Sequence, residues 1–372
     1  MIMDTIKREK FKKLFDKLNV DFLLIVRPES VRYVTEAGPT YGKINLVVVP
    51  QNVNECFSIT SPRDSSIIKN SSWIRNVEIF DETPSESKNL ENAISVASKA
   101  VKALGHGKLT LGVEMEGISA RGFDLLKKKM PRTEYVDVSE DLRFIRLTKT
   151  PSEIQIIKHA AKIGDEIMLT MMENFQVGKT ELDVAGEGVR LAFNYGVERF
   201  LWRAVMIGVR TALIGASPTH VKAKEGDNLL IDYGFVFNGY VCDITRTVAL
   251  KKVPSKIVKM HETVTSALQA IIDWIEPGVR VREIVDYVQN AIEGFGYKRV
   301  PHDLGHGVGL EGHERPIFNE KEDMVLEAGM VFAVEPGIYI ENLGGVRVED
   351  EILVTPQGCE VLTQCRKNLI MN

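Results

Sequence analysis

The chain has 372 residues, of which 44% are hydrophobic and 26% are charged, and its formal net charge is -4. This composition is typical of a globular protein with a sizeable core, and the length suggests two or three domains. The mildly acidic balance argues against nucleic acid or an anionic membrane as a partner, and no apolar run approaches the roughly 20 residues of a membrane span.

The N-terminus and the cysteines predict a cytoplasmic location. The first ten residues, Met1-Ile-Met-Asp-Thr-Ile-Lys-Arg-Glu-Lys, are charged and lack the apolar core of a signal peptide. Four cysteines (Cys56, Cys242, Cys359 and Cys365) show no Cys-x-x-Cys spacing, so we expect reduced structural thiols. Cys242 adjoins Asp243 but should point to the opposite face of its strand, into the core.

The first part of the chain alternates helix and strand. Apolar residues at helical spacing predict a helix over 6–18 and another near 90–104, and apolar runs predict strands at 22–26, 46–50 and 109–113. This alternation predicts an α/β domain with a mainly buried sheet. No constellation of metal ligands or nucleophiles occurs in this part of the sequence.

A domain boundary is predicted near residues 146–149, which divides the chain into residues 1–146 and 147–372. There Thr150-Pro151-Ser152-Glu153 combines a capping box with a proline at the first helical position. The helix that it starts should run over 151–173, with Gly164 allowing close approach of a neighbouring element. Further helices are expected over 180–195, 254–274 and 281–295.

Residues 228–250 read as a β-hairpin that carries two carboxylates. Asn238-Gly239 is a strong signal for a two-residue type I′ turn, because both residues tolerate positive φ. The turn places Phe237 opposite Tyr240 and Asp232 opposite Thr245, so Asp232 and Asp243 become diagonal neighbours on one face. Two carboxylates on an apolar hairpin repel each other, and we expect a cation between them.

A second copy of this unit follows. Asp232 lies six residues after Gly226, and Glu335 lies six residues after Gly329, each at the end of an apolar strand. Glu349 lies on the strand after Gly344, which is the second strand of this later unit, just as Asp243 lies on the second strand of the unit that contains Asp232. Because paired helices precede both copies, the sequence predicts a duplicated helix-helix-hairpin unit that brings four carboxylates to one pseudo-two-fold axis.

The segment 301–316 offers a further ligand. It contains three of the seven histidines, and His306 is flanked by Gly305 and Gly307, which leave the imidazole unobstructed. Oxygen-rich sites with one imidazole suit Mn²⁺, Co²⁺ or Zn²⁺. Two such ions about 3.5 to 4 Å apart activate a water and clamp a tetrahedral intermediate, so hydrolysis is the natural reaction.

At this point the residues resemble the pita-bread metallopeptidases, a family that includes prolidase (Xaa-Pro dipeptidase), aminopeptidase P and methionine aminopeptidase. The matching motifs are Asp232-Tyr-Gly, Asp243-Ile-Thr-Arg, Gly305-His-Gly-Val-Gly, Val334-Glu-Pro-Gly and Arg347-Val-Glu-Asp. The pattern Leu310-Glu-Gly-His-Glu-Arg-Pro is closest to the prolidase and aminopeptidase P branch. The resemblance covers about the whole chain, strongly after Lys149 and loosely before it.

The resemblance implies an α+β pita-bread catalytic domain, preceded in the sequence by an α/β creatinase/prolidase-type N-terminal domain. It implies two divalent metal ions, with Mn²⁺ or Co²⁺ favoured and Zn²⁺ as an alternative, on Asp232, Asp243, His306, Glu335 and Glu349. His313 would hydrogen-bond the substrate carbonyl, Glu335 would handle the proton of the nucleophile, and Arg347 would lie near the metals. The N-terminal domain would make dimer contacts and wall the active site of the partner subunit in a homodimer; a simple stabilising appendage is the alternative.

One position departs from the family pattern. Members of this branch carry a histidine that binds substrate and shuttles protons, and an alignment without gaps puts Gly215 there and Arg210 at a family asparagine. The nearest histidine, His220, lies five positions later. Either the loop is rearranged so that His220 serves, or the chain lacks this group; Trp202, Arg203 and Arg210 are candidates to line an altered pocket.

Three functions stay open from the sequence. The first is a two-metal exopeptidase that hydrolyses the Xaa-Pro bond of a dipeptide or short peptide. The second is an aminopeptidase P-like enzyme, or another C-N hydrolase with an altered substrate, which the Gly215 departure motivates. The third is a catalytically inactive binding protein, and the intact set of five ligands counts against it.

Overall fold

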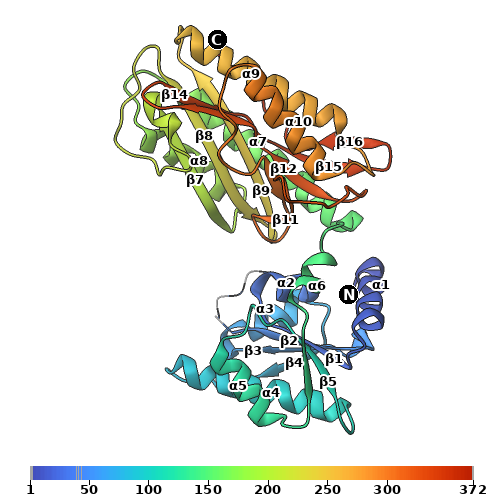
Figure 1. The fold of residues 1–372 in the computed structure, drawn as a ribbon. Helices are drawn as coiled ribbons and strands as arrows, with labels where there is room; N and C mark the ends of the chain where they lie inside the picture. The colour runs from blue at the N-terminus through green and yellow to red at the C-terminus, as the bar shows by residue number, and fades with distance from the viewer. Residues whose placement is uncertain (1–2, 39, 41, 43, 371–372) are drawn as a thin grey trace. The chain divides into compact units, whose positions relative to one another are not determined.

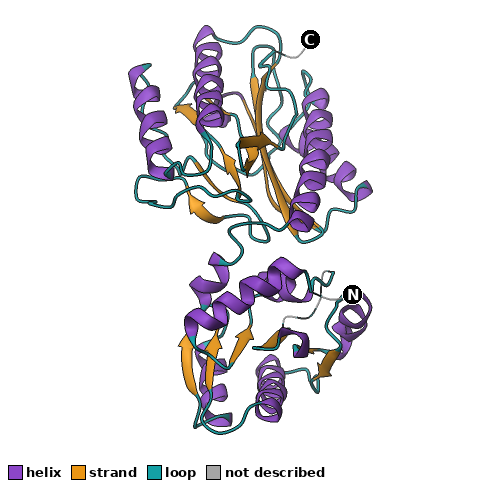
Figure 2. Ribbon diagram, turned by 90° about the vertical axis from the view of Figure 1, so that its right-hand side faces the viewer, coloured by secondary structure: helices purple, strands orange, loops and turns teal. Residues whose placement is uncertain are grey.

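The computed structural model describes residues 3–38, 40, 42 and 44–370 (Figure 1). The chain forms two compact units, residues 1–146 and residues 147–372. Figure 2 shows that each unit combines helices with strands. In the part that the structure describes, no helix is long and apolar enough to cross a membrane.

The N-terminal unit is built on one mixed sheet. Its strands are β1 (Phe22–Ile25), β2 (Leu46–Pro50), β3 (Phe57–Thr60), β4 (Asn76–Ile79), β5 (Thr110–Val113) and β6 (Glu134–Asp137). They are ordered β4-β3-β2-β1-β5-β6, and β2 is antiparallel to both of its neighbours while the other pairs are parallel. The central strands β1 and β2 are buried throughout, as predicted for this part of the chain.

Helices cover both faces of this sheet. They are α1 (Thr5–Leu18), α2 (Pro28–Thr35), α3 (Pro62–Ser71), α4 (Glu86–Leu104), α5 (Ala120–Lys129) and α6 (Ser139–Phe144), with a short 3-10 helix η1 (Val53–Glu55). In Figure 1, α4 and α5 lie on one side of the sheet and α2 and α3 on the other. The sequence had indicated α1 and α4 but not the shorter helices, because one or two turns carry too little periodicity.

The C-terminal unit contains two helix pairs. They are α7 (Pro151–Asn174) with α8 (Glu181–Asn194), and α9 (Ser255–Trp274) with α10 (Val281–Gly294). The capping box of Thr150 and Glu153 is present at the start of α7. A Cβ on Gly164 would collide with Sγ of Cys242, so the glycine lets α7 approach the neighbouring strand and Cys242 is a buried core residue, as predicted.

The first hairpin has the predicted register. In this unit β7 (Arg199–Ile207), β8 (Asn228–Phe237) and β9 (Tyr240–Ala249) form a three-stranded sheet, followed along the chain from β7 by the 3-10 helix η2 (Gly208–Ala212). Phe237 pairs with Tyr240 and Asp232 with Thr245. Helices α7 and α8 pack behind this sheet.

The second copy is not one continuous hairpin. Its strands are β12 (Val331–Val334), β13 (Gly337–Ile340), β14 (Gly344–Arg347) and β15 (Asp350–Thr355). β13 pairs with β14, whereas β12 and β15 join the sheet β11-β10-β12-β15-β16 with β10 (Gly305–Gly307), β11 (Glu314–Ile317) and β16 (Gly358–Val361). Pro336 has no N–H to donate, and the ladder breaks beside it. Glu335 and Glu349 both lie at the breaks.

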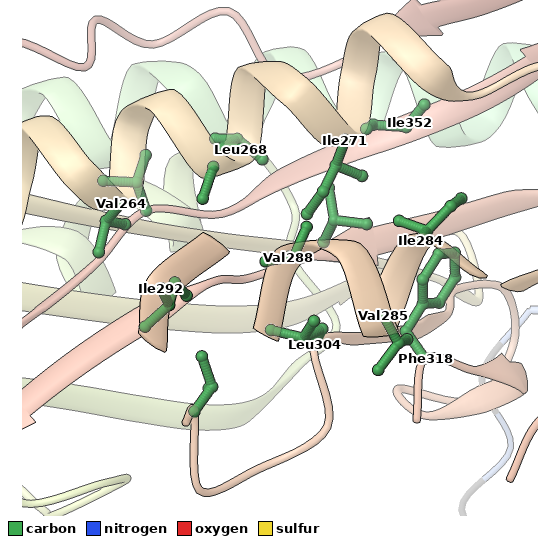
Figure 3. Close-up of a cluster of buried hydrophobic side chains, with 14 of the residues drawn as sticks. Val264, Leu268, Ile271, Ile284, Val285, Val288, Ile292, Leu304, Phe318 and Ile352 are labelled. Carbon is green, nitrogen blue, oxygen red and sulfur yellow. The ribbon is translucent and has the colours of Figure 1, made fainter. Parts of the chain in front are cut away.

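Apolar side chains from α9 and α10 form the core behind this second half. Figure 3 shows Leu268 and Ile271 of α9 facing Ile284 and Val288 of α10, close to Ile352 of β15. In each half of this unit a pair of helices is followed by strands. The predicted α+β architecture is therefore confirmed.

Candidate metal centre

The predicted ligands converge on one cavity of about 920 Å³ in the C-terminal unit. Asp232 of β8 and Asp243 of β9 reach it from the first hairpin, His306 comes from β10, and Glu335 and Glu349 come from the two breaks in the second copy. His313 and Arg347 line the same cavity. Segments more than a hundred residues apart thus bring their acids to one place.

The potential ligand atoms lie close enough to share metal ions. Asp232, Asp243 and Glu349 offer oxygens within 4.8 Å of one another, and His306, Glu335 and Glu349 also meet within 4.8 Å. His306 Nε2 lies 3.4 Å from Asp243 Oδ2 and 3.6 Å from Glu335 Oε1. Glu349 belongs to both groups, so it can join two ion positions.

Backbone hydrogen bonds from the two strand breaks fix the acids of the second copy. The N–H of Glu335 donates to Leu304 O over 2.8 Å, and the N–H of Glu349 donates to Thr245 O over 3.1 Å. The Thr245 hydroxyl donates to Glu349 Oε2 over 2.6 Å. The interruption in the hairpin therefore ties these two acids to the segment before β10 and to β9.

Burial disfavours the charge on these carboxylates. It raises the pKa of Glu335 to about 7 and the pKa of Asp232 to about 6, although Arg347 opposes both changes. The pKa of Glu349 is raised by burial and then by Asp243, Glu335 and Asp232. Burial alone would lower the pKa of His306, but its hydrogen bond to Asp243 and the nearby acids raise it.

Arg347 is the buried cation of the cluster, and its contacts are fixed. It contacts the carboxylate of Asp232, its Nε lies 3.7 Å from Glu335 Oε2, and its Nη1 donates to Tyr339 Oη over 2.7 Å. Tyr339 Oη lies 2.8 Å from His302 Nε2, and His302 Nδ1 lies 2.7 Å from Asp303 O. Because a carbonyl only accepts, Nδ1 of His302 carries the proton and Nε2 accepts from Tyr339.

His313 lies next to this cluster on the chain before β11. Its ring stacks on that of His306, with centroids 3.9 Å apart and planes at 26°. Burial lowers the pKa of His313, and the neighbouring His306 lowers it further. A neutral imidazole at the edge of the cavity can donate one hydrogen bond to a bound carbonyl.

His220 is the predicted site residue that the structure does not bring to the cavity. Its side chain is exposed, and it is not among the residues of the cavity wall. The preceding Thr219 is anchored by its N–H and hydroxyl, which both donate to Glu181 Oε2 over 2.7 Å. The rearrangement that would have let His220 serve is therefore not seen.

Gly215 does line the cavity, and a Cβ built on it meets no atom within 4 Å. The position of the family histidine is thus open space. Arg210 lies outside the cavity wall, where its Nε donates to the buried Glu181 over 2.9 Å and its Nη2 donates to Ser217 O. Arg210 has a structural role, whereas Trp202 and Arg203 do border the cavity.

The donor set fits divalent metal ions. Asp232, Asp243, Glu335 and Glu349 can carry four negative charges, whereas Arg347 supplies one positive charge, so 4 − 1 leaves an excess of three. Carboxylates that are desolvated and share one site disfavour one another's charge, and cations with oxygen and imidazole ligands relieve this. Without such cations the repulsion between the carboxylates destabilises the folded chain, and bound cations would remove this repulsion.

Two contributors to this site were not identified from the sequence. His302 was grouped with its neighbours only as one of three histidines, and Tyr339 carried no signal. The alternation of β13 could have placed Tyr339 and Gly337 on the same face of the second hairpin. That His302 meets Tyr339 depends on a contact between distant segments, which no local pattern contains.

Comparison with known proteins agrees with the metallopeptidase resemblance of the sequence. Residues 155–356 match metallopeptidase family M24, and residues 7–148 match the creatinase/prolidase N-terminal domain. The Xaa-Pro dipeptidase of Pyrococcus horikoshii is 32% identical over 372 residues, with 98% of this chain and 99% of that protein covered.

Solved structures agree with the sequence comparison. The Xaa-Pro dipeptidase from Bacillus anthracis superposes with a TM-score of 0.88 at 30% identity, covering 98% of this chain and 99% of the other. The prolidase from Pyrococcus horikoshii OT3 gives a TM-score of 0.86 at 31% identity with the same coverage.

Proposed function

The chain belongs to metallopeptidase family M24 and is a metal-dependent hydrolase, and on that premise we propose that it hydrolyses the Xaa-Pro bond of dipeptides or short peptides. The observation that carries this proposal is the convergence of Asp232, Asp243, His306, Glu335 and Glu349 on one cavity. The dipeptidase relatives support it over another C-N hydrolase on the same scaffold.

These five residues would hold two divalent ions, for which we propose Mn²⁺ or Co²⁺, with Zn²⁺ as the alternative. When bound, the ions supply a water of lowered pKa and polarise the scissile carbonyl. Two of the three groups whose ligand atoms meet within 4.8 Å, namely Asp232 with Asp243 and Glu349, and His306 with Glu335 and Glu349, have only Glu349 in common, which supports two ion positions over one.

The remaining chemistry belongs to side chains of the chain. Glu335, whose side chain is 17% exposed, would take the proton of the attacking water and pass it to the leaving nitrogen as the C–N bond breaks. His313 would donate a hydrogen bond to the carbonyl oxygen as charge develops there. Arg347 would hold Asp232 and Glu335 in place through its buried contacts.

The apolar part of the cavity wall suits an uncharged substrate group. Leu182, Ala185 and Val189 of α8 line it together with Ile214 and Ile317. Such a wall favours an apolar side chain or a proline ring. A proline amide has no N–H and differs in geometry from ordinary peptide bonds, so a dedicated pocket is needed to cleave before it.

We also propose a homodimer in which the N-terminal unit makes subunit contacts and walls the partner's active site; this follows from the family resemblance. A cytoplasmic location is proposed from the four cysteines, which are free thiols, as a reducing compartment requires.

The experiment that tests the function compares substrates. Chelator-stripped protein is reloaded with Mn²⁺ or Co²⁺ and given a Met-Pro dipeptide, a longer Xaa-Pro peptide and a Met-Ala control. Metal-dependent cleavage of Met-Pro but not of Met-Ala is expected. Cleavage of the longer peptide alone would favour an aminopeptidase, for which the open space at Gly215 leaves room. Cleavage of neither proline peptide by metal-loaded protein would refute the proposal.

A further inference from the structure

We infer that Trp202 is a positioning residue of the metal centre, whose indole N–H orients the Asp243 carboxylate and whose ring holds His313 against His306. This inference rests on the metal centre proposed above. It concerns a tryptophan of β7 that no metal-binding motif of the chain includes.

A bulge in β7 turns Trp202 toward the site. Phe200 pairs with Phe235 and Trp202 pairs with Gly234, so Leu201 is an extra residue in this strand. Because of this extra residue, Phe200 packs against Tyr233 on the core side of the sheet, with ring centroids 5.3 Å apart. Trp202 instead lies over the face that carries Asp232 and Asp243.

Two glycines form a slot for the indole. A Cβ on Gly234 would collide with the Trp202 ring, and a Cβ on Gly312 would lie 2.7 Å from its Cη2. Neither glycine is among those with positive φ, so each is required for space and not for backbone conformation. The ring of Trp202 therefore fits only because two positions, one on β8 and one beside His313, have no side chain.

The indole N–H is directed at a proposed metal ligand. Trp202 Nε1 donates to Asp243 Oδ1 over 3.0 Å, while Asp243 Oδ2 lies 3.4 Å from His306 Nε2. An indole N–H can only donate, so this bond fixes the rotation of the carboxylate. Hydrogen bonds of this kind orient a metal ligand, and their loss typically lowers metal affinity or activity by about 10- to 100-fold.

The same ring packs against His313. The two rings meet edge to face, with centroids 5.3 Å apart and planes at 63°, and His313 stacks on His306 on its other side. His313 is partly exposed, and its ring lies between these two rings, so the contacts with them hold it in place. Trp202 therefore links the position of Asp243 to that of His313.

The test removes the donor and keeps an aromatic ring. Trp202→Phe is compared with Trp274→Phe, which alters a tryptophan of α9 that packs on Tyr287 outside the cavity wall. Mn²⁺ binding to chelator-stripped protein is measured by calorimetry, with thermal unfolding as the check on folding. Affinity about 10- to 100-fold weaker in Trp202→Phe, with Trp274→Phe unchanged, is expected.

Unchanged affinity in a folded Trp202→Phe would overturn the inference and leave the proposed function standing. Failure of the parent chain to bind Mn²⁺ would overturn both. At saturating Mn²⁺, kcat on Met-Pro should also fall in Trp202→Phe, because the Asp243 carboxylate loses the donor that fixes its rotation, whereas a purely structural loss would track the fraction unfolded.

A second measurement leaves residue 202 unchanged, so it holds even where Trp202→Phe does not fold. Protein labelled with ¹⁵N-tryptophan gives signals for the indoles of the three tryptophans, Trp73, Trp202 and Trp274, and Phe variants of the other two assign them. As Zn²⁺ is added, the Trp202 signal is expected to shift in step with binding. A Trp202 signal that stays in place while Zn²⁺ binds would overturn the inference.

Discussion

Replacing Glu349 by glutamine should have opposite effects on the protein with and without metal. The residue is 1% exposed, and one of its carboxylate oxygens lies within 4.8 Å of an oxygen of Asp232 and of one of Asp243. At an effective dielectric constant of about 20, two unit charges at that separation repel by about 3.5 kcal/mol. Glutamine keeps the shape and can still accept the Thr245 hydroxyl, so relief of repulsion should dominate in the stripped protein.

The expected net gain is smaller than the gross repulsion, because the carboxylates of the parent share protons and because a charge-assisted hydrogen bond is weakened. We expect Glu349→Gln to stabilise the chelator-stripped protein by about 1 to 3 kcal/mol at pH 8. In the parent, Mn²⁺ at a hundred times its dissociation constant should add about 2.7 kcal/mol, which the variant should lose together with hydrolysis.

Urea unfolding with chelator and with Mn²⁺ measures both effects. Glu320→Gln removes the same charge from an exposed pair with Arg299, and its free energy of unfolding should change by less than about 0.5 kcal/mol under both conditions. If Glu349→Gln destabilised the stripped protein, or if Mn²⁺ stabilised the variant as much as the parent, Glu349 would be a structural carboxylate and the reasoning would be refuted.

Three further predictions concern His313, Gly164 and His261. His313→Gln should lower kcat on Met-Pro by about 10²- to 10³-fold with Mn²⁺ affinity measured by calorimetry little changed, because it removes a donor to the carbonyl oxygen; equal losses in both would contradict that role. Gly164→Ala should destabilise the chain by about 1 to 3 kcal/mol in urea unfolding, since its Cβ would collide with Cys242 Sγ, and Cys242→Ala in the same chain should recover most of the loss. Burial lowers the pKa of His261 to about 4. The contribution of His261 to stability is therefore present above the unfolded pKa of about 6.5 and is lost as the pH falls toward 4. Relative to His261→Leu, the parent should lose about 3 kcal/mol in its free energy of unfolding over this range; a difference between the two proteins that does not change with pH would refute this.

Local chemistry made the first hairpin predictable. Asn238 and Gly239 have φ of 47° and 83°, as a type I′ turn requires, and the turn alone sets the register of Asp232 against Thr245. The same holds for the helix that begins after Thr150, where the capping box specifies the start. Signals carried by a few adjacent residues were sufficient in both places.

The second copy shows where local patterns stop. Its spacing predicted the positions of Glu335 and Glu349, but not the break of the strand beside Pro336. The hydrogen bond from Glu349 N to Thr245 O was not predictable either, because it joins segments about a hundred residues apart. The place of Trp202 likewise depends on a bulge and on two distant glycines. In the N-terminal unit, β4 and β6 are short edge strands with exposed residues, so they lack the apolar run that announced β1 and β2.

The measurement that tests the central claim most directly is a titration of chelator-stripped protein with Mn²⁺ in which bound metal and the rate of Met-Pro hydrolysis are measured in the same samples. We predict no hydrolysis by the stripped protein, a rate that rises with bound metal, and saturation at two ions per chain. Hydrolysis by the fully stripped protein, or two bound ions without cleavage of Met-Pro or of a longer Xaa-Pro peptide, would contradict the account.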